Sequence, residues 1–151
     1  MRSELSRLVI QVTLALGLLT AGLASTARAE KATQLEARVS LSAQVMEVLV
    51  DGRPTFAWKV STAGKGYHTP TGSWKPTRLE RMWHSRQYDN APMPHSVFFH
   101  EGYAVHATNM IKRLGRPASH GCVRLHPDNA ADFFELVATF GAANTTITIT
   151  E

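Results

Sequence analysis

Only one segment of this 151-residue chain repeats its apolar residues with the spacing of an α-helix. Between residues 127 and 141, apolar side chains fall at i, i+3, i+4 and i+7, which predicts a helix with one apolar face. That face consists of Ala130, Phe133, Phe134 and Val137. Pro127 suits the first turn, Asp128 and Asp132 favour the same end, and Gly141 ends the helix. The other patterned segments have the spacing of strands, so we expect a mainly β fold with one or two short helices.

The strand signals are short and are separated by turns. Residues 38–41 alternate, residues 45–50 are apolar apart from Glu47, and Asp51-Gly52 indicates a hairpin leading into residues 54–61. The remaining predicted strands are residues 96–99, 103–105 and 145–150. The strand at 103–105 would deliver the next residue, His106, to the end of a strand, where its side chain can leave the sheet.

In two neighbouring segments the apolar residues have neither the spacing of a helix nor that of a strand. Residues 73–86 combine tryptophan and histidine with lysine and arginine, and residues 88–94 are predicted as a loop because Pro92 and Pro94 block regular hydrogen bonding. A loop rich in aromatic and cationic side chains could line a substrate groove, or it could cover the core as a lid.

The first 29 residues have the pattern of a secretory signal peptide. Arg2 and Arg7 precede a mostly apolar run at 8–24, and Ala27-Arg28-Ala29 is an A-x-A cleavage signal. We expect cleavage after Ala29; an uncleaved membrane anchor is the competing interpretation. We then expect residues 30–37 to form a loose lead-in, residues 38–151 to form one domain, and the mature protein to be exported to the periplasm or cell-wall space.

The charge of the mature segment excludes an obvious nucleic-acid partner. Without the three arginines and one glutamate of residues 1–29, it keeps 13 basic and 11 acidic side chains, a net charge of +2. The basic residues are scattered and are not interleaved with aromatic side chains. A single cysteine also means that no internal disulfide can form.

That cysteine, Cys122, has neighbours suited to covalent chemistry. His120 lies two residues before it, Arg124 two after it, and Gly121 allows a tight turn that aims backbone amides at one spot. His106 precedes it by sixteen residues. Cys122 could instead be a small buried cysteine or a metal ligand, although His120 and Cys122 lack the paired spacing of a metal motif.

At these residues the chain resembles the L,D-transpeptidase catalytic domain, also called the YkuD family. The family pattern is a His-Gly-Thr segment followed by Gly-x-Pro-x-Ser-His-Gly-Cys-x-Arg. The chain has His106-Ala107-Thr108 and then Gly115-Arg116-Pro117-Ala118-Ser119-His120-Gly121-Cys122-Val123-Arg124. Ala107 departs from the pattern, where the family commonly has glycine. The resemblance covers about residues 38–149 and includes a turn at Thr69-Pro70-Thr71-Gly72; it implies a β-sandwich with a helix after the cysteine.

The resemblance also implies roles for the site residues. Cys122 would be the nucleophile and His106 its proton acceptor, with no metal and no cofactor. The Gly121 and Cys122 amides would hold the oxyanion. His120 would shape the site beside the thiol, and Ser119 would orient the imidazoles. Substrate contacts would come from Arg124, which could instead fix the turn, and from Thr108 and His95.

The implied activity is acyl transfer from tetrapeptide stems of peptidoglycan through a thioester. The acceptor stays open: a second stem, a lipoprotein lysine, a free D-amino acid, or water, which would make the protein a carboxypeptidase or hydrolase. Two further classes compete with this interpretation, a cysteine hydrolase of another fold and a catalytically silent wall-binding module. In such a hydrolase the cysteine precedes its histidine, the reverse of the order here.

Overall fold

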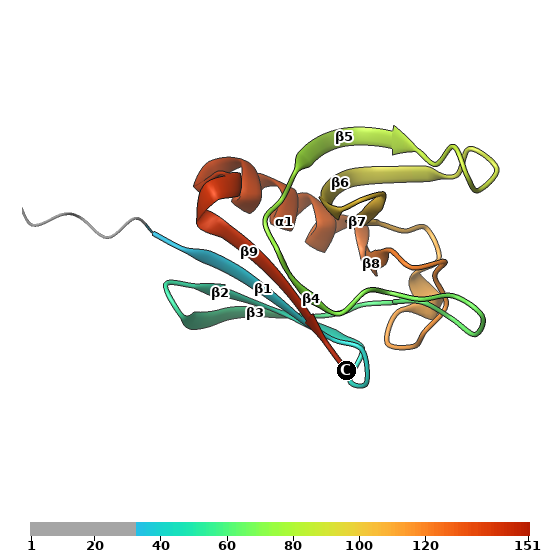
Figure 1. Ribbon diagram of the computed structural model, residues 1–151, viewed down its shortest axis with the longest axis horizontal. Coiled ribbons are helices and arrows are strands. Elements are labelled where there is room, and N and C mark those ends of the chain that lie inside the picture. Colours follow the sequence, from blue (N-terminus) through green and yellow to red (C-terminus); the bar gives the residue numbers. More distant parts are fainter. Residues whose placement is uncertain (1–32) are drawn as a thin grey trace, which may run out of the picture. The chain divides into compact units, whose positions relative to one another are not determined.

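The computed structural model describes residues 33–151, which form two β-sheets and one α-helix (Figure 1). The first sheet has the strand order β3-β2-β1-β9-β4 and the second β5-β6-β7-β8. The first sheet comprises β1 (Leu35–Ser40), β2 (Val45–Val50), β3 (Arg53–Lys59), β4 (Gly72–Trp74) and β9 (Thr145–Thr150). The second comprises β5 (Arg78–His84), β6 (Pro92–His100), β7 (Tyr103–Ala107) and β8 (Val123–Leu125). The predicted mainly β fold is therefore confirmed, whereas the predicted signal peptide lies outside the described residues.

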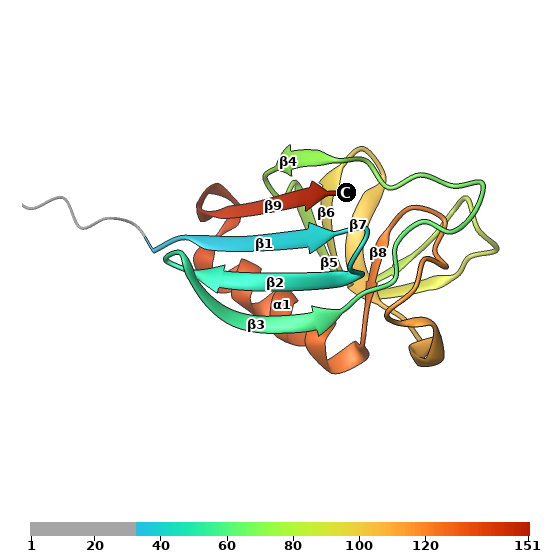
Figure 2. The same cartoon turned by 90° about the horizontal axis from the view of Figure 1, so that it is seen from below.

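The first sheet joins the two ends of the domain (Figure 2). Strands β1, β2 and β3 form consecutive antiparallel hairpins, and β9 pairs in parallel with β1 from Leu35↔Thr145 to Ser40↔Thr150. Alternate residues of β1 are buried, beginning with Leu35. The prediction of a loose lead-in is wrong for residues 35–37, because Leu35 and Ala37 already belong to the core.

The second sheet includes a segment that the sequence predicts as a loop. Pro92 and Pro94 lie in β6, opposite His84 and Met82 of β5. Strand β7 pairs with β6 only from Val97 onward, so this part of β6 has one neighbouring strand. Proline is tolerated at such an edge because the missing N–H is not needed on the open side. The loop prediction is therefore wrong for residues 92–94.

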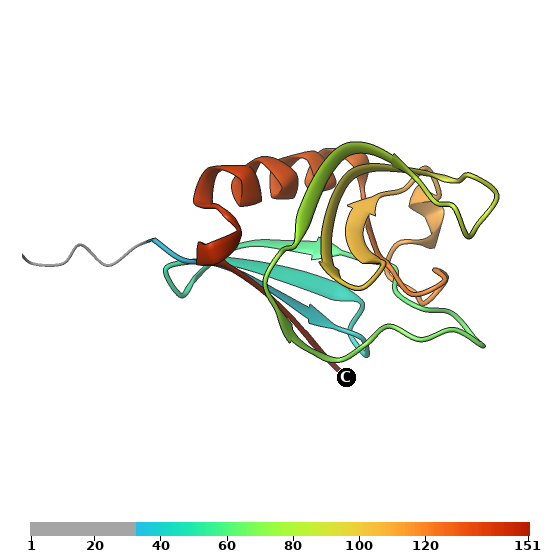
Figure 3. The ribbon, with the colours of Figure 1, turned by 45° about the horizontal axis from the view of Figure 1, so that its top comes forward.

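Helix α1 (Pro127–Phe140) packs against β6, β7 and β1 with the four apolar residues predicted for it. It lies on the same side of the first sheet as the second sheet does (Figure 3), and side chains from both sheets and from α1 form one hydrophobic cluster. The His126 Nδ1 accepts a hydrogen bond from the Asp128 N–H at the N-terminus of α1, and Gly141 ends the helix at φ +80°. Two 3-10 turns, η1 (Ile111–Arg113) and η2 (Ala142–Asn144), complete the described chain. None of the helices in residues 33–151 has the length and hydrophobicity that a membrane span requires.

Candidate active site

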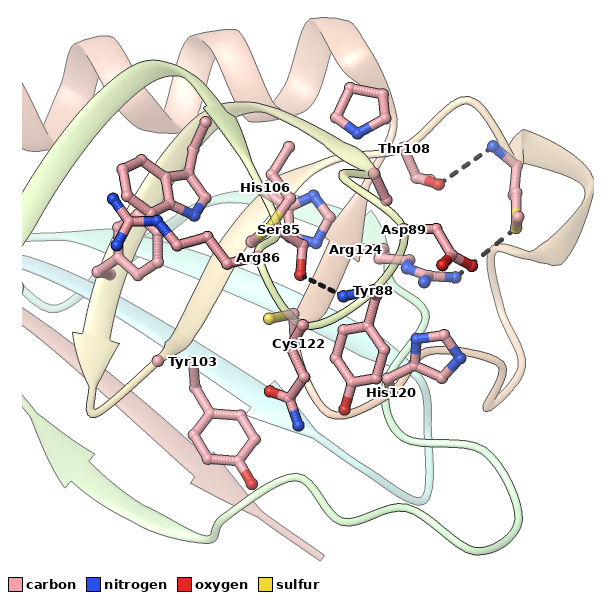
Figure 4. Close-up of a pocket in the computed structure, with 18 of the residues that line it drawn as sticks. Ser85, Arg86, Tyr88, Asp89, Tyr103, His106, Thr108, His120, Cys122 and Arg124 are labelled. Carbon is pink, nitrogen blue, oxygen red and sulfur yellow. Dashed lines mark hydrogen bonds between the residues drawn. The ribbon is translucent and has the colours of Figure 1, made fainter.

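The pairing of β7 with β8 brings His106 and Cys122 to one face of the second sheet. These strands are parallel, with Val105 opposite Val123 and His106 opposite Arg124. Because side chains alternate along a strand, Val105 and Val123 enter the core while His106 and Arg124 point to the other face. Cys122 immediately precedes β8 and shares that face. All three side chains line a pocket of about 660 Å³ (Figure 4).

The hydrogen bond of His106 fixes its tautomer. Its Nδ1 lies 2.7 Å from the Ala107 carbonyl oxygen, which can only accept, so Nδ1 carries the proton and Nε2 keeps a lone pair. The imidazole is only 6% exposed. Burial lowers the pKa of His106 to about 4; the Ala107 carbonyl opposes this shift and the Arg124 charge adds to it. At neutral pH the ring is therefore an uncharged base.

Cys122 lies against an apolar wall. Its side chain packs against a cluster formed by Met93, Phe98 and Ala104, against which Trp83 also packs. Burial raises the pKa of the thiol, while the Ala104 backbone and the Arg124 charge partly oppose the rise. The sequence suggests surroundings that stabilise a thiolate, but the resting group here is a thiol. Its proton must therefore leave during any nucleophilic attack, and a neutral His106 can accept it.

Ser119 organises the turn that carries Cys122. Its buried hydroxyl donates to the Cys122 carbonyl oxygen at 2.7 Å and accepts from the Gly121 N–H at 3.0 Å. The expectation that Ser119 orients the imidazoles is wrong, because both of these bonds stay within the turn. The Gly121 N–H already donates to the Ser119 hydroxyl. Of the two amides predicted to hold the oxyanion, the Cys122 N–H is therefore the remaining candidate.

A side chain at position 121 would disrupt the turn. Gly121 has φ +137°, and a Cβ there would lie 2.6 Å from Tyr103 Cε1 and 2.7 Å from the His68 carbonyl oxygen. The Thr69 hydroxyl donates to the Gly121 carbonyl at 2.7 Å and accepts from the Ala63 N–H at 3.0 Å. Thr69 is 2% exposed, so the Thr-Pro-Thr-Gly segment stabilises the turn through a buried hydrogen bond. The sequence shows that segment without revealing this role.

Arg124 and Thr108 line the pocket and also brace its backbone. One Arg124 nitrogen, Nη1, donates to the Ala118 carbonyl at 3.3 Å and contacts the Met110 sulfur at 3.7 Å. The Arg124 backbone exchanges two hydrogen bonds with Ser61, at 2.9 and 3.0 Å. The Thr108 hydroxyl accepts from the Met110 N–H at 3.1 Å. Of the two roles predicted for Arg124, these contacts favour fixing the turn.

His120 lies among aromatic side chains in the pocket. Its ring stacks on Tyr88 with centroids 4.2 Å apart and contacts Tyr67 at 4.5 Å. Tyr88 belongs to residues 85–91, the short loop between β5 and β6, and lines the pocket with His120. The segment considered as a groove lining or a lid therefore consists largely of strands, and its remaining loop borders the site. Within residues 33–151, no three His, Cys, Asp or Glu side chains are grouped as metal ligands.

His95 does not line this pocket, so its predicted role in the groove is wrong. It packs edge-on against Phe134 of α1 with ring centroids 5.6 Å apart, and its Nδ1 is buried without a partner among the described residues. Its φ is +50°, and the pairing of β5 with β6 skips it between Pro94 and Ser96. This irregularity turns His95 toward the helix, and alternation along the sequence does not reveal it.

Comparison with known proteins agrees with this geometry. The family described as L,D-transpeptidase catalytic domain (YkuD) matches residues 35–149, and the chain belongs to that family. Comparison with curated proteins finds no match.

Solved structures share the fold. An L,D-transpeptidase from Mycobacterium smegmatis superposes with a TM-score of 0.70 at 22% identity, covering 79% of this chain and 59% of that one. An L,D-transpeptidase from Stackebrandtia nassauensis superposes with a TM-score of 0.68 at 26% identity, covering 83% of this chain and 62% of that one. The LD transpeptidase LdtMt1 in complex with imipenem superposes with a TM-score of 0.69 at 23% identity, covering 78% of this chain and 59% of that one. The chain thus spans about three-fifths of the length of these proteins.

Proposed function

We propose that this protein is an exported, cysteine-dependent L,D-transpeptidase that acts on the tetrapeptide stems of peptidoglycan. The observation that carries the proposal is the placement of Cys122 and a neutral His106 on one face of a pocket, next to the family's signature turn. Membership of the L,D-transpeptidase family supplies the reaction class. Export to the periplasm or cell-wall space rests on the pattern of residues 1–29.

In the first half-reaction, Cys122 Sγ attacks the carbonyl of the third stem residue, a diaminopimelate. The thiol proton moves to His106 Nε2, and the Cys122 N–H donates to the developing oxyanion. As the bond to D-alanine breaks, His106 returns the proton to the leaving amine. The product is a thioester on Cys122.

In the second half-reaction, an acceptor amine attacks the thioester and gives its proton to His106, the bond between the acyl carbon and Cys122 Sγ breaks, and His106 returns the proton to the sulfur. A second stem would give a cross-link, a lipoprotein lysine would give anchoring, and a D-amino acid would give exchange. The apolar wall of Met93, Phe98 and Ala104 lies against the Cys122 side chain. This wall limits the approach of water and supports transfer to an amine over hydrolysis.

The proposal is tested by mass analysis of muropeptides after incubation of the full chain with tetrapeptide-bearing sacculi. We expect loss of D-alanine together with an amine-linked product. Cys122→Ser should abolish the change because an alkoxide is a far more basic nucleophile, and His106→Ala should lower turnover by about 10²–10⁴-fold. Near-wild-type turnover in either folded variant contradicts the mechanism, and release of D-alanine without a linked product would indicate a hydrolase.

A further inference from the structure

Three arginines line the pocket, and two of them already have partners. Arg124 is held by the Ala118 carbonyl and the Met110 sulfur. Arg78 forms an ion pair with Glu80 at 2.9 Å, and its guanidinium lies 4.3 Å and 4.0 Å from the ring centroids of Trp83 and Phe98. Arg78 thus has a carboxylate partner, and neutral acceptors hold the guanidinium of Arg124 in place.

The third arginine, Arg86, has no such partner. Among the described residues no carboxylate pairs with it and no acceptor takes a hydrogen bond from its guanidinium. Its guanidinium carbon lies over the face of Trp83, 5.5 Å from the ring centroid. An aromatic face can hold a guanidinium by cation–π attraction and leave its N–H groups free for an anion.

The backbone around Arg86 is closed into a short, bonded loop. The Ser85 N–H donates to the Ala91 carbonyl at 2.9 Å, and the Ala91 N–H donates to the Tyr88 carbonyl at 2.8 Å. The Tyr88 N–H also donates to the Ser85 hydroxyl at 3.2 Å. This loop therefore presents Arg86 to the pocket from a defined position.

The charges around the nucleophile are arranged asymmetrically. Arg86 and Arg124 lie on opposite sides of Cys122, and Asp89 lies on the side of Arg124 (Figure 4). Glu101 is the other acidic residue that lines the pocket, and neither it nor Asp89 forms an ion pair within the described chain. Arg86 is exposed and unpaired among the described residues, so its guanidinium is open to an anion that enters the pocket with the substrate.

We propose that Arg86 is a specificity-determining residue that binds a carboxylate of the peptide substrate beside the bond attacked by Cys122. This inference rests on the proposed function. A tetrapeptide stem offers two carboxylates near that bond: the terminal one of the leaving D-alanine and the side-chain one of the diamino acid. Both have the planar shape that a guanidinium fork recognises.

The test compares three synthetic tetrapeptides with the full chain: the free acid, the C-terminal carboxamide and the side-chain carboxamide. Release of the fourth residue gives kcat/KM for each. We expect the wild-type chain to prefer the free acid over one carboxamide by about tenfold or more, the range of a charge-assisted hydrogen bond. The carboxamide that is disfavoured identifies which carboxylate Arg86 binds.

Two substitutions separate recognition from a general structural effect. Arg86→Gln should abolish the preference between acid and amide, and Arg86→Lys should retain part of it because charge remains without the fork. Arg81→Gln is the matched control, since Arg81 lies on β5, is exposed and pairs with Glu135 at 2.8 Å outside the pocket. That variant should keep the wild-type preference.

The outcomes are distinguishable. An unchanged preference in Arg86→Gln, or no preference in the wild-type chain that turns over all three peptides, overturns the role of Arg86 and leaves the proposed function standing. Absence of turnover of every peptide by the wild-type chain overturns the proposed function and this inference with it. Added salt should reduce the preference of the wild-type chain for the free acid, because screening weakens the attraction between the guanidinium and the carboxylate.

Discussion

The proposed catalytic pair of this protein rests in its uncharged form. Burial lowers the pKa of His106 and raises that of Cys122, so a thiolate–imidazolium pair is disfavoured before substrate arrives. The positive charge of Arg124 favours the thiolate but opposes the imidazolium. We infer that the thiolate develops mainly as the carbonyl is attacked, when the charge passes to the oxyanion.

The buried neutral His106 should make the fold sensitive to acid. Unfolded, this histidine binds a proton near pH 6.5, whereas in the folded chain its pKa is about 4. Between these values the unfolded state binds more protons, so the free energy of unfolding falls as pH falls, by at most about 3 kcal/mol at pH 4. Urea unfolding of wild type and His106→Gln at pH 7 and pH 4.5 measures this. Equal losses in both proteins would contradict it.

At the scale of elements, the turn from Ser119 to Cys122 depends on a second segment. Thr69 links that turn to Ala63 through two hydrogen bonds of one hydroxyl. Sequence spacing predicts the catalytic turn because its residues are contiguous, but Thr69 lies 52 residues before Gly121. Its role arises only when the two segments pack together.

Thr69→Val should therefore weaken both the fold and the site. Valine keeps the volume of threonine and leaves the buried Gly121 carbonyl and Ala63 N–H without their partner, which costs about 1–3 kcal/mol. Thr71→Val in the same tetrapeptide is the control, because Thr71 is exposed. Thermal unfolding and turnover of both variants check this prediction. A Thr69→Val protein as stable and active as Thr71→Val would refute it.

Element boundaries are predictable where one face of a segment is buried. The predicted apolar face from Ala130 to Val137 and the predicted alternation in residues 145–150 are both confirmed. In each segment the buried side chains recur with the period of that secondary structure. Strand β6 is only partly predictable. Its prolines lie where β6 has only one neighbouring strand, and its irregularity at His95 changes the face of the sheet to which the side chains point. Both features depend on how β6 pairs with its neighbours.

At the scale of the whole domain, the two halves of the site differ in how far the sequence reveals them. His106 of β7 and Cys122, immediately before β8, share one face of the sheet because β7 and β8 pair in parallel, and the signature motif indicates this partnership. Another part of the pocket lining, with Trp83, Arg86 and Tyr88, comes from β5 and the loop that follows it. The aromatic and cationic composition of this region indicates a groove lining or a lid but does not decide between them, because the position of each residue depends on the pairing of β5 with β6.

The proposed mechanism depends most on Cys122 being a nucleophile activated by His106, and intact mass after incubation with a carbapenem tests this directly. A strained β-lactam carbonyl presents the same electrophile as the stem peptide, so the full chain should gain the mass of one drug molecule. The adduct should map to the peptide containing Gly121-Cys122, be absent in Cys122→Ala, and form more slowly in His106→Ala at neutral pH. An adduct that persists in Cys122→Ala would place the nucleophile elsewhere and contradict the mechanism.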